Sequence, residues 1–321
     1  MTEEKLKAPF PYFGGKSKVA EIIWRALGQP RHYIEPFFGS GAVLLLRPDY
    51  DPASHTESVC DKDGFVANVW RSIQFSPDET AKWCDWPVNH ADLSARKNAL
   101  LKNEDRLLEN LTADDMWHDP KIAGYWIWAA SCWIGNGLTS PTNAMQHISS
   151  AGDGVHKMPH IIDAGKGVHA GKQGNIYDLF QKLSDRMRRV RVVCGDWTRV
   201  CGGNWQTGLG TCGMFFDPPY GVENRDVKIY HHDTTTVARD VEAWCLARGD
   251  DPKMRIVVAG YEDEYKTLES AGWSKIEWTA HGGYANIGKQ SSQGKENKGR
   301  ERLWFSTHCL QENNDEKQYL F

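Results

Sequence analysis

The sequence predicts an α/β protein whose core is a parallel sheet. A short strand at Tyr33 and Ile34, a glycine loop, a helix from about Ala42 and a strand ending at Asp61 follow one another at the spacing of a parallel α/β unit. Three later apolar segments, at 190–194, 212–216 and 254–261, have the composition of buried strands. The chain of 321 residues, with 40% hydrophobic and 25% charged residues, is long enough to bury such a core.

The first 64 residues are predicted to form one half of the α/β domain. Residues 17–27 place apolar side chains at helical spacing and are followed by Gly28, a common helix stop signal. The strand, loop, helix and strand described above come next. We expect this half to carry the binding site of a cofactor, for the reasons given below.

Residues 65–185 are predicted to form a mainly helical insertion. Residues 91–111 alternate leucines with charges and fit a surface helix, whereas KIAGYWIWAASCWIG is apolar on all sides and is expected to be a buried helix. Residues 139–175 are rich in glycine and lack periodicity, so we expect a mobile loop that orders on a partner. His156 and His160 have the spacing of a metal pair, but no carboxylate or cysteine is placed to complete a site, so we expect no metal.

Residues 186–321 are predicted to complete the α/β domain. VRVVCGD is strand-like and ends at Asp196, and the apolar strand CGMFF leads into Asp217. Two later segments, GWSKIEWTA and RERLWFS, are expected to be antiparallel partners. Residues 311–321 form a polar tail that we expect to be frayed.

Composition limits the cellular setting. The sequence has no uninterrupted stretch of about 18 apolar residues, and its N-terminus lacks the layout of a signal peptide. Its eight cysteines form no CxxC pair, which favours reduced thiols over disulfides or a zinc ribbon. We therefore expect a soluble cytoplasmic protein that does not engage a membrane, with a monomer as the default state.

Positive charge is clustered although the net charge is −4. One cluster lies in DRMRRVRVV and the other in KQSSQGKENKGRERLWF. Clusters of this kind can bind nucleic-acid phosphates, although a solvated helix end and a solvated loop explain them equally well. The candidate phosphate contacts are Arg186, Arg188, Arg189, Lys298 and Arg300.

The first glycine loop indicates a cofactor that contains adenosine. Gly39 and Gly41 lie at a strand-to-helix turn, where a ligand can approach the backbone closely. Asp61 ends the next strand, a position that accepts hydrogen bonds from ribose hydroxyls in doubly wound sheets. A dinucleotide is less favoured because Leu44 stands where its pattern has a third glycine. GGKS is not a triphosphate-binding loop, since the required first glycine is replaced by Phe10.

The stretch FFDPPY indicates chemistry on an exocyclic amine. A strand that ends in Asp217 projects the carboxylate at the carboxyl edge of the sheet, where open α/β folds bind ligands. Pro218 and Pro219 stiffen the backbone and offer carbonyls without competing N–H groups, and Tyr220 supplies a flat ring. Two acceptors for the amine hydrogens and a stacking face would turn the amine lone pair towards an electrophile.

The segments PFPYFGGKS, YIEPFFGSGAVLL, CDKD, VVCGDW and FFDPPY, in that order, resemble the Dam-type (class alpha) family of DNA adenine-N6 methyltransferases, many of them from bacteria and phages. The resemblance covers roughly residues 9–64 and 190–309. It implies a Rossmann-like sheet with helices on both faces and S-adenosylmethionine as methyl donor. The acceptor would be the 6-amino group of an adenine flipped out of double-stranded DNA. The helical insertion at 65–185 would be the target-recognition domain.

The resemblance also implies roles for individual residues. Asp61 would hold the ribose, Asp196 the adenine ring of the cofactor, and the segment from Asp217 to Tyr220 would be the catalytic loop. Family members often have Trp where this chain has Tyr12. The cofactor-binding residues that the resemblance carries over are Tyr12, Gly14, Gly15, Lys16, Glu35, Pro36, Phe37, Phe38, Gly39, Gly41, Asp61, Asp196 and Trp197.

Several alternatives stay open. The same chemistry could act on RNA, because a splayed adenine looks alike in both polymers. A non-catalytic DNA-binding relative would keep the fold without the reaction, but the intact Asp217 and glycine loop argue against it. Methylation of a protein glutamine is less favoured, since that chemistry uses Asn where this chain has Asp217, and a dinucleotide oxidoreductase is the weakest alternative.

Overall fold

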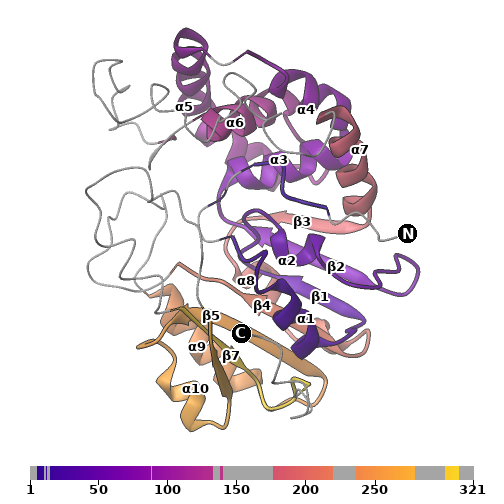
Figure 1. Cartoon of the computed structure of the whole chain (residues 1–321), viewed down its shortest axis with the longest axis vertical. Helices are drawn as coiled ribbons and strands as arrows, with labels where there is room; N and C mark the ends of the chain where they lie inside the picture. The colour runs from indigo at the N-terminus through magenta and orange to yellow at the C-terminus, as the bar shows by residue number, and fades with distance from the viewer. Residues whose placement is uncertain are drawn as a thin grey trace.

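The computed structural model describes residues 6–10, 12, 15–87, 89–132, 138–139, 176–219, 236–278 and 301–310. Its centre is a seven-stranded sheet, which confirms the predicted α/β class (Figure 1). The strands are β1 (His32–Glu35), β2 (Thr56–Asp61), β3 (Val190–Cys194), β4 (Cys212–Phe216), β5 (Met254–Tyr261), β6 (Ser274–Glu277) and β7 (Glu301–Phe305). The helices are α1 (Ala20–Leu27), α2 (Ala42–Leu45), α3 (Gly64–Phe75), α4 (Pro77–Cys84), α5 (His90–Ala113), α6 (Pro120–Cys132), α7 (Ile176–Met187), α8 (Thr198–Cys201), the 3-10 turn Trp205–Thr207, α9 (Val237–Arg248) and α10 (Lys266–Ser270).

The strand order in the sheet is β3-β2-β1-β4-β5-β7-β6. The strands from β3 to β5 are parallel, whereas β7 is antiparallel to both β5 and β6, as expected from the sequence. The chain runs outwards from β1 to β3 and then returns to place β4 on the other side of β1. The boundary between β1 and β4 is therefore the point where the strand order reverses, and open α/β sheets bind ligands at the carboxyl end of such a boundary.

The sheet is buried on both faces because its strands alternate between two apolar cores. Tyr33 of β1 and Phe215 of β4 face one core, and Ile34 and Met214 face the other. The first core also contains the apolar sides of α1, α2 and α3, and the second those of α8, α9 and α10. Helices on both faces, as expected, explain why β4 is a continuous apolar run rather than an alternating one.

The helices α4 to α7 pack on the sheet through α3 and share its first core (Figure 1). In α5 the leucines at 93, 100, 107 and 111 are buried, which is the amphipathic helix that the sequence predicts. In α6 Trp126 and Trp128 are buried, which confirms the predicted buried helix. Residues 65–185 are thus mainly helical where the structure describes them, but they extend the core of the sheet rather than forming one of their own.

A buried arginine ties this helical region to the sheet. Arg71 of α3 donates from Nη1 to the carbonyl oxygens of Leu111 and Asp114 at the end of α5, 3.1 Å away in each case. Its Nε and Nη2 donate to the carbonyl oxygen of Val192 in β3. Because these carbonyls end a helix or lie in the edge strand, one guanidinium satisfies acceptors that the regular structure leaves unpaired.

Several sequence predictions fall outside the described residues. These are the loop at 139–175 apart from Thr139, with His156 and His160, and the tail at 311–321. None of the helices in the described ranges has both the length and the apolar character needed to cross a bilayer. The seven cysteines whose side chains the structure describes are free and buried, in agreement with reduced thiols.

Candidate active site at the carboxyl edge of the sheet

Four acidic residues follow neighbouring parallel strands and therefore meet at one edge of the sheet. Glu35 ends β1, Asp61 ends β2, Asp217 directly follows β4, and Asp196 follows β3 by two residues. The strands that carry them are adjacent in the order β3-β2-β1-β4. The structure thus brings together acids that the sequence places far apart, at the boundary where the strand order reverses.

The glycine loop after β1 requires glycine at both predicted positions. Gly39 and Gly41 have φ values of +47° and +63°, a region that other residues rarely adopt. A Cβ atom at Gly39 would lie 2.6 Å from the Tyr12 ring, and one at Gly41 would lie 2.7 Å from the Phe38 ring. Tyr12 therefore packs directly on the loop that the sequence assigned to the same site.

Asp61 links this loop to the end of β2. Its Oδ2 accepts a hydrogen bond from the backbone N–H of Gly39 at 2.8 Å, and its Oδ1 accepts one from the N–H of Asp63 at 2.9 Å. Burial and the charge of Asp63 raise the pKa of Asp61 to about 7. Each carboxylate oxygen has a second lone pair, so the group can also accept from ligand hydroxyls while it holds the loop.

Asp217 forms an ion pair with Lys16. The distance from Lys16 Nζ to Asp217 Oδ2 is 2.8 Å, and the lysine side chain is only 3% exposed, against 22% for the aspartate. The ammonium also lies 5.8 Å from the ring centroid of Trp278. The sequence marked Lys16 as a ligand contact but gave no sign that it pairs with Asp217, and it did not mark Trp278 at all.

Glu35 is a buried acid next to this pair. Its Oε2 accepts a hydrogen bond from the Tyr33 hydroxyl at 3.0 Å, and the side chain is buried. Burial raises the pKa of Glu35 well above its usual range, and repulsion from Asp217 contributes in the same direction. The raised pKa favours the neutral form of this carboxyl group beside Asp217.

Two aromatic rings lie close together beyond the carboxyl ends of β1 and β3. The half-buried Phe37 ring lies 6.3 Å from the Trp197 ring at an interplanar angle of 28°, and both rings pack near Phe216. Trp197 is buried, so it supports Phe37 from within the core. Asp196 is exposed, and its Oδ1 accepts hydrogen bonds from the N–H and hydroxyl of Thr198.

The remaining predicted site residues divide into two groups. Pro36, Phe38 and Pro218 are buried, Pro219 is half-buried and Gly15 is exposed, all in the segments that form this edge. Outside the described residues lie Gly14, Tyr220, Lys298 and Arg300.

The arginine cluster does not reach this site. Arg186 donates to both carboxylate oxygens of Glu57 at 2.6 and 2.9 Å, and Glu57 lies near the start of β2. Arg189 donates to the carbonyl of Pro52 in the loop before β2, and Arg188 pairs with Asp185. Because α7 leads into β3, which is parallel to β2, the cluster meets the amino edge of the sheet, opposite the edge that carries Asp217. The structure thus places these arginines away from Asp217, and their role as phosphate contacts stays a prediction.

No protein-family model matches this chain, and no curated protein matches it with significant similarity.

Proposed function

We propose that the protein is an S-adenosylmethionine-dependent methyltransferase that acts on the 6-amino group of an adenine flipped out of double-stranded DNA. The observation that carries this proposal is the position of Asp217 at the end of β4, directly beside the glycine loop of β1. The resemblance of FFDPPY and YIEPFFGSGAVLL to Dam-type enzymes supplies the identity of the reaction. The target sequence and the role of the helical region as a recognition domain belong to the same proposal.

The residues at this edge fit an adenosine-type cofactor. The hydroxyls of a ribose and the amine of an adenine are hydrogen-bond donors, and the edge offers acceptors in Asp61 and in the exposed Asp196. The half-buried Phe37 ring, which lies beside Trp197, provides an apolar surface at the same edge. When bound, S-adenosylmethionine would supply an electrophilic methyl group.

Asp217 and the proline carbonyls would orient the target amine. The carboxylate and the Pro218 carbonyl can accept the two hydrogens of an exocyclic amine, which turns its lone pair out of conjugation with the ring. Pro218 is buried, and the following Pro219 restricts its ψ, so its carbonyl keeps its direction when the base enters. The alkylated amine is acidic and gives up one proton, for which Asp217 is the nearest base.

Lys16 and Glu35 would act on Asp217 rather than on the base. The Lys16 ammonium fixes the orientation of one carboxylate oxygen by a hydrogen bond of 2.8 Å. Burial raises the pKa of Glu35 and so favours its neutral form, which limits the negative charge beside the reacting amine. We expect both to be positioning residues.

The sheet also bears on the alternatives. In the dinucleotide-binding order the sixth strand continues a parallel sheet, whereas here β7 is antiparallel and lies between β5 and β6. Together with Leu44 in the glycine loop, this disfavours the oxidoreductase reading. RNA as the acceptor polymer stays an outcome of the test, because the site described above would accept an adenine from either.

The test uses the full chain with S-adenosylmethionine and, in separate reactions, unmodified duplex DNA and structured RNA. Each polymer is then digested to nucleosides and analysed by mass spectrometry. We expect methyl on the adenine 6-amino group in DNA alone. Product in RNA alone would reassign the substrate, and absence of product from both would reject the enzyme and leave a binding role.

A further inference from the structure

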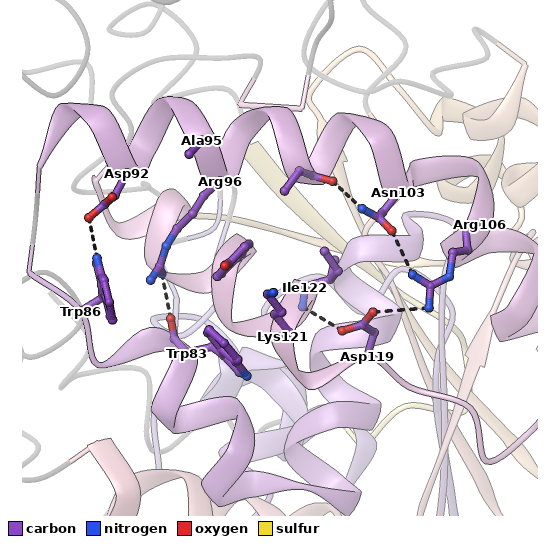
Figure 2. A pocket seen from close by; sticks show the side chains of 12 residues that line it. Trp83, Trp86, Asp92, Ala95, Arg96, Asn103, Arg106, Asp119, Lys121 and Ile122 are labelled. Carbon is purple, nitrogen blue, oxygen red and sulfur yellow. Dashed lines mark hydrogen bonds and ion pairs between the residues drawn. The ribbon is translucent and has the colours of Figure 1, made fainter.

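A groove on the helical part of the molecule plays no part in the reaction proposed above. It has a volume of about 410 Å³ and lies between α5 on one side and the segments of α4 and α6 on the other. Figure 2 shows Asp92, Arg96 and Arg106 of α5 pointing towards Trp86, Trp83 and the start of α6. The volume is in the range of sites that hold small ligands.

Two indole rings in this groove are held in fixed orientations. Trp83 Nε1 donates to Glu79 Oε1 at 2.9 Å, and Trp86 Nε1 donates to Asp92 Oδ2 at 2.6 Å. With their polar atoms engaged, the rings can offer only their faces and edges to a ligand. Trp86 is 45% exposed, which is unusual for a tryptophan whose position is so well defined.

A buried arginine contacts both of these tryptophan residues. Arg96 Nη1 donates to the carbonyl oxygen of Trp83 at 2.8 Å. Its guanidinium carbon lies 5.2, 4.5 and 4.4 Å from the ring centroids of Trp86, Tyr125 and Trp128. Trp128 Nε1 in turn donates to the carbonyl oxygen of Trp86. The aromatic surface is thus preorganised, so a ligand that stacks on it need not order it.

The groove also has an excess of positive charge. Its lining includes Arg96, Arg106 and Lys121 but only two acids, Asp92 and Asp119. Lys121 is exposed and lies 4.9 Å from the ring centroid of Trp83, and it forms no ion pair within the part of the chain that the structure describes. Arg106 lies 3.8 Å from Asp119 and is largely exposed. Two cations therefore stand at the rim of an aromatic surface.

We propose that this groove binds an unpaired nucleotide, with the base stacked on Trp83 and Trp86 and the phosphate near Lys121 and Arg106. An apolar peptide would leave these cations unused, whereas flat rings bordered by cations suit a planar base joined to an anion. The side-chain amide of Asn103 lies in the same lining and can both donate to and accept from a base edge. The inference goes beyond the proposed function, since binding here requires no methyl transfer.

The test measures the affinity of the full chain for a fluorescein-labelled dT10 strand by anisotropy at low salt, without S-adenosylmethionine. Because the stacking of a base on an aromatic ring contributes strongly to binding, we expect Trp86→Leu to weaken binding at least about fivefold. Trp86→Phe keeps a stacking face and should bind within about threefold of the wild type. Lys121→Gln should weaken binding by about threefold and lower its salt dependence.

Matched controls come from outside the groove. Trp205→Leu removes another exposed tryptophan and Lys102→Gln another exposed lysine, and both should bind as the wild type does. Competition by thymidine monophosphate distinguishes a site for free nucleotides, which it would occupy, from one that needs a strand. Absence of strand binding by the wild type would overturn the proposal. It would also be overturned if Trp86→Leu and Lys121→Gln both bound the strand as tightly as the wild type does. Binding of a proline-rich peptide with the same sensitivity to Trp86→Leu would overturn it in favour of a protein partner.

Discussion

The acidic residues at the two edges of the central sheet differ in how they are paired. At the amino edge, Glu57 is fully buried, and its carboxylate receives hydrogen bonds from both Arg47 and Arg186. At the carboxyl edge, Asp217 has a lysine, but Glu35 is buried with no cation paired to it in the described residues, and Asp61 relies on backbone N–H groups. Burial therefore raises the pKa values of Glu35 and Asp61.

This is the difference expected between a charge network that stabilises the fold and one that serves a ligand-binding site. A buried acid whose oxygens all face cations contributes to the fold and has little left to offer a ligand. Acids with perturbed pKa values at a ligand-binding edge are instead typical of functional sites. The following predictions test whether the two edges are as different in solution as they are in the structure.

The largest expected effect is on catalysis at the carboxyl edge. Asp217→Asn keeps the shape of the side chain but removes its charge, so we expect methyl transfer to fall about 100- to 1,000-fold, as for the loss of a key electrostatic group. The affinity for S-adenosylmethionine should stay within about threefold. Single-turnover transfer and equilibrium binding give the two values. A variant that transfers methyl at half the wild-type rate would refute the catalytic role of Asp217, and a large loss of cofactor affinity would assign it to cofactor binding instead.

The second prediction concerns the stability of the amino edge. Glu57→Gln leaves Arg47 and Arg186 without their carboxylate, and removal of one partner of a buried ion pair costs about 3–5 kcal/mol. The transfer rate per folded molecule should not change. Urea denaturation measures the loss, with Arg188→Gln as the control, because Arg188 forms only an exposed pair with Asp185 and should change stability by less than about 0.5 kcal/mol.

A double-mutant cycle tests the ion pair of the carboxyl edge. Asp217→Ala leaves the buried Lys16 ammonium without its acid, and we expect a loss of about 1–3 kcal/mol in the free energy of unfolding. In the background of Lys16→Met the same substitution should cost much less, because no buried charge is stranded. Equal losses in both backgrounds would mean that the pair does not couple in solution.

The smallest effect is a pH dependence of cofactor binding. The ionised form of Asp61 is the better acceptor for ribose hydroxyls, and its pKa of about 7 means that acidification removes this form. The dissociation constant for S-adenosylmethionine should therefore rise as pH falls below about 7, by up to about tenfold per pH unit. Calorimetric titrations between pH 5.5 and 8.5 would show this, and Asp61→Asn should bind more weakly with a flatter profile.

The same raised pKa has a consequence for folding. Because folded Asp61 binds its proton more tightly than the unfolded chain does, it stabilises the fold below its ordinary pKa of 3.8, and this contribution is lost as pH rises towards about 7. Glu35 acts in the same direction, starting from its ordinary pKa of 4.5. The free energy of unfolding of Asp61→Asn and of Glu35→Gln should therefore change less with pH than that of the wild type as pH rises from 3.8 towards about 7.

The sequence could predict where the acids of the site would meet, but not what they would pair with. Asp61, Asp196 and Asp217 each follow an apolar run, and parallel strands align their carboxyl ends, so a local pattern determines the shared edge. The pair of Lys16 with Asp217 depends instead on how the chain before α1 packs against the sheet. No local pattern carries that information.

The same reason explains why the sequence could not place the arginines relative to Asp217. A run of basic residues is visible in the sequence, but its edge of the sheet depends on the direction in which α7 enters β3. The groove on the helices was missed in a related way. The composition of α6 predicted a buried helix. Only the packing of the helices shows that Tyr125 of α6 lines the groove together with Trp83 and Trp86.

Photolabelling would test most directly whether the carboxyl edge of the sheet binds S-adenosylmethionine. The protein is irradiated with S-adenosylmethionine carrying a radioactive methyl group and then digested with trypsin, and the labelled peptides are sequenced. We expect label in the peptides that span 32–62 or 192–199, which carry the glycine loop, Asp61 and Asp196. Label confined to peptides of the helical region, or no label that excess unlabelled cofactor can displace, would contradict it.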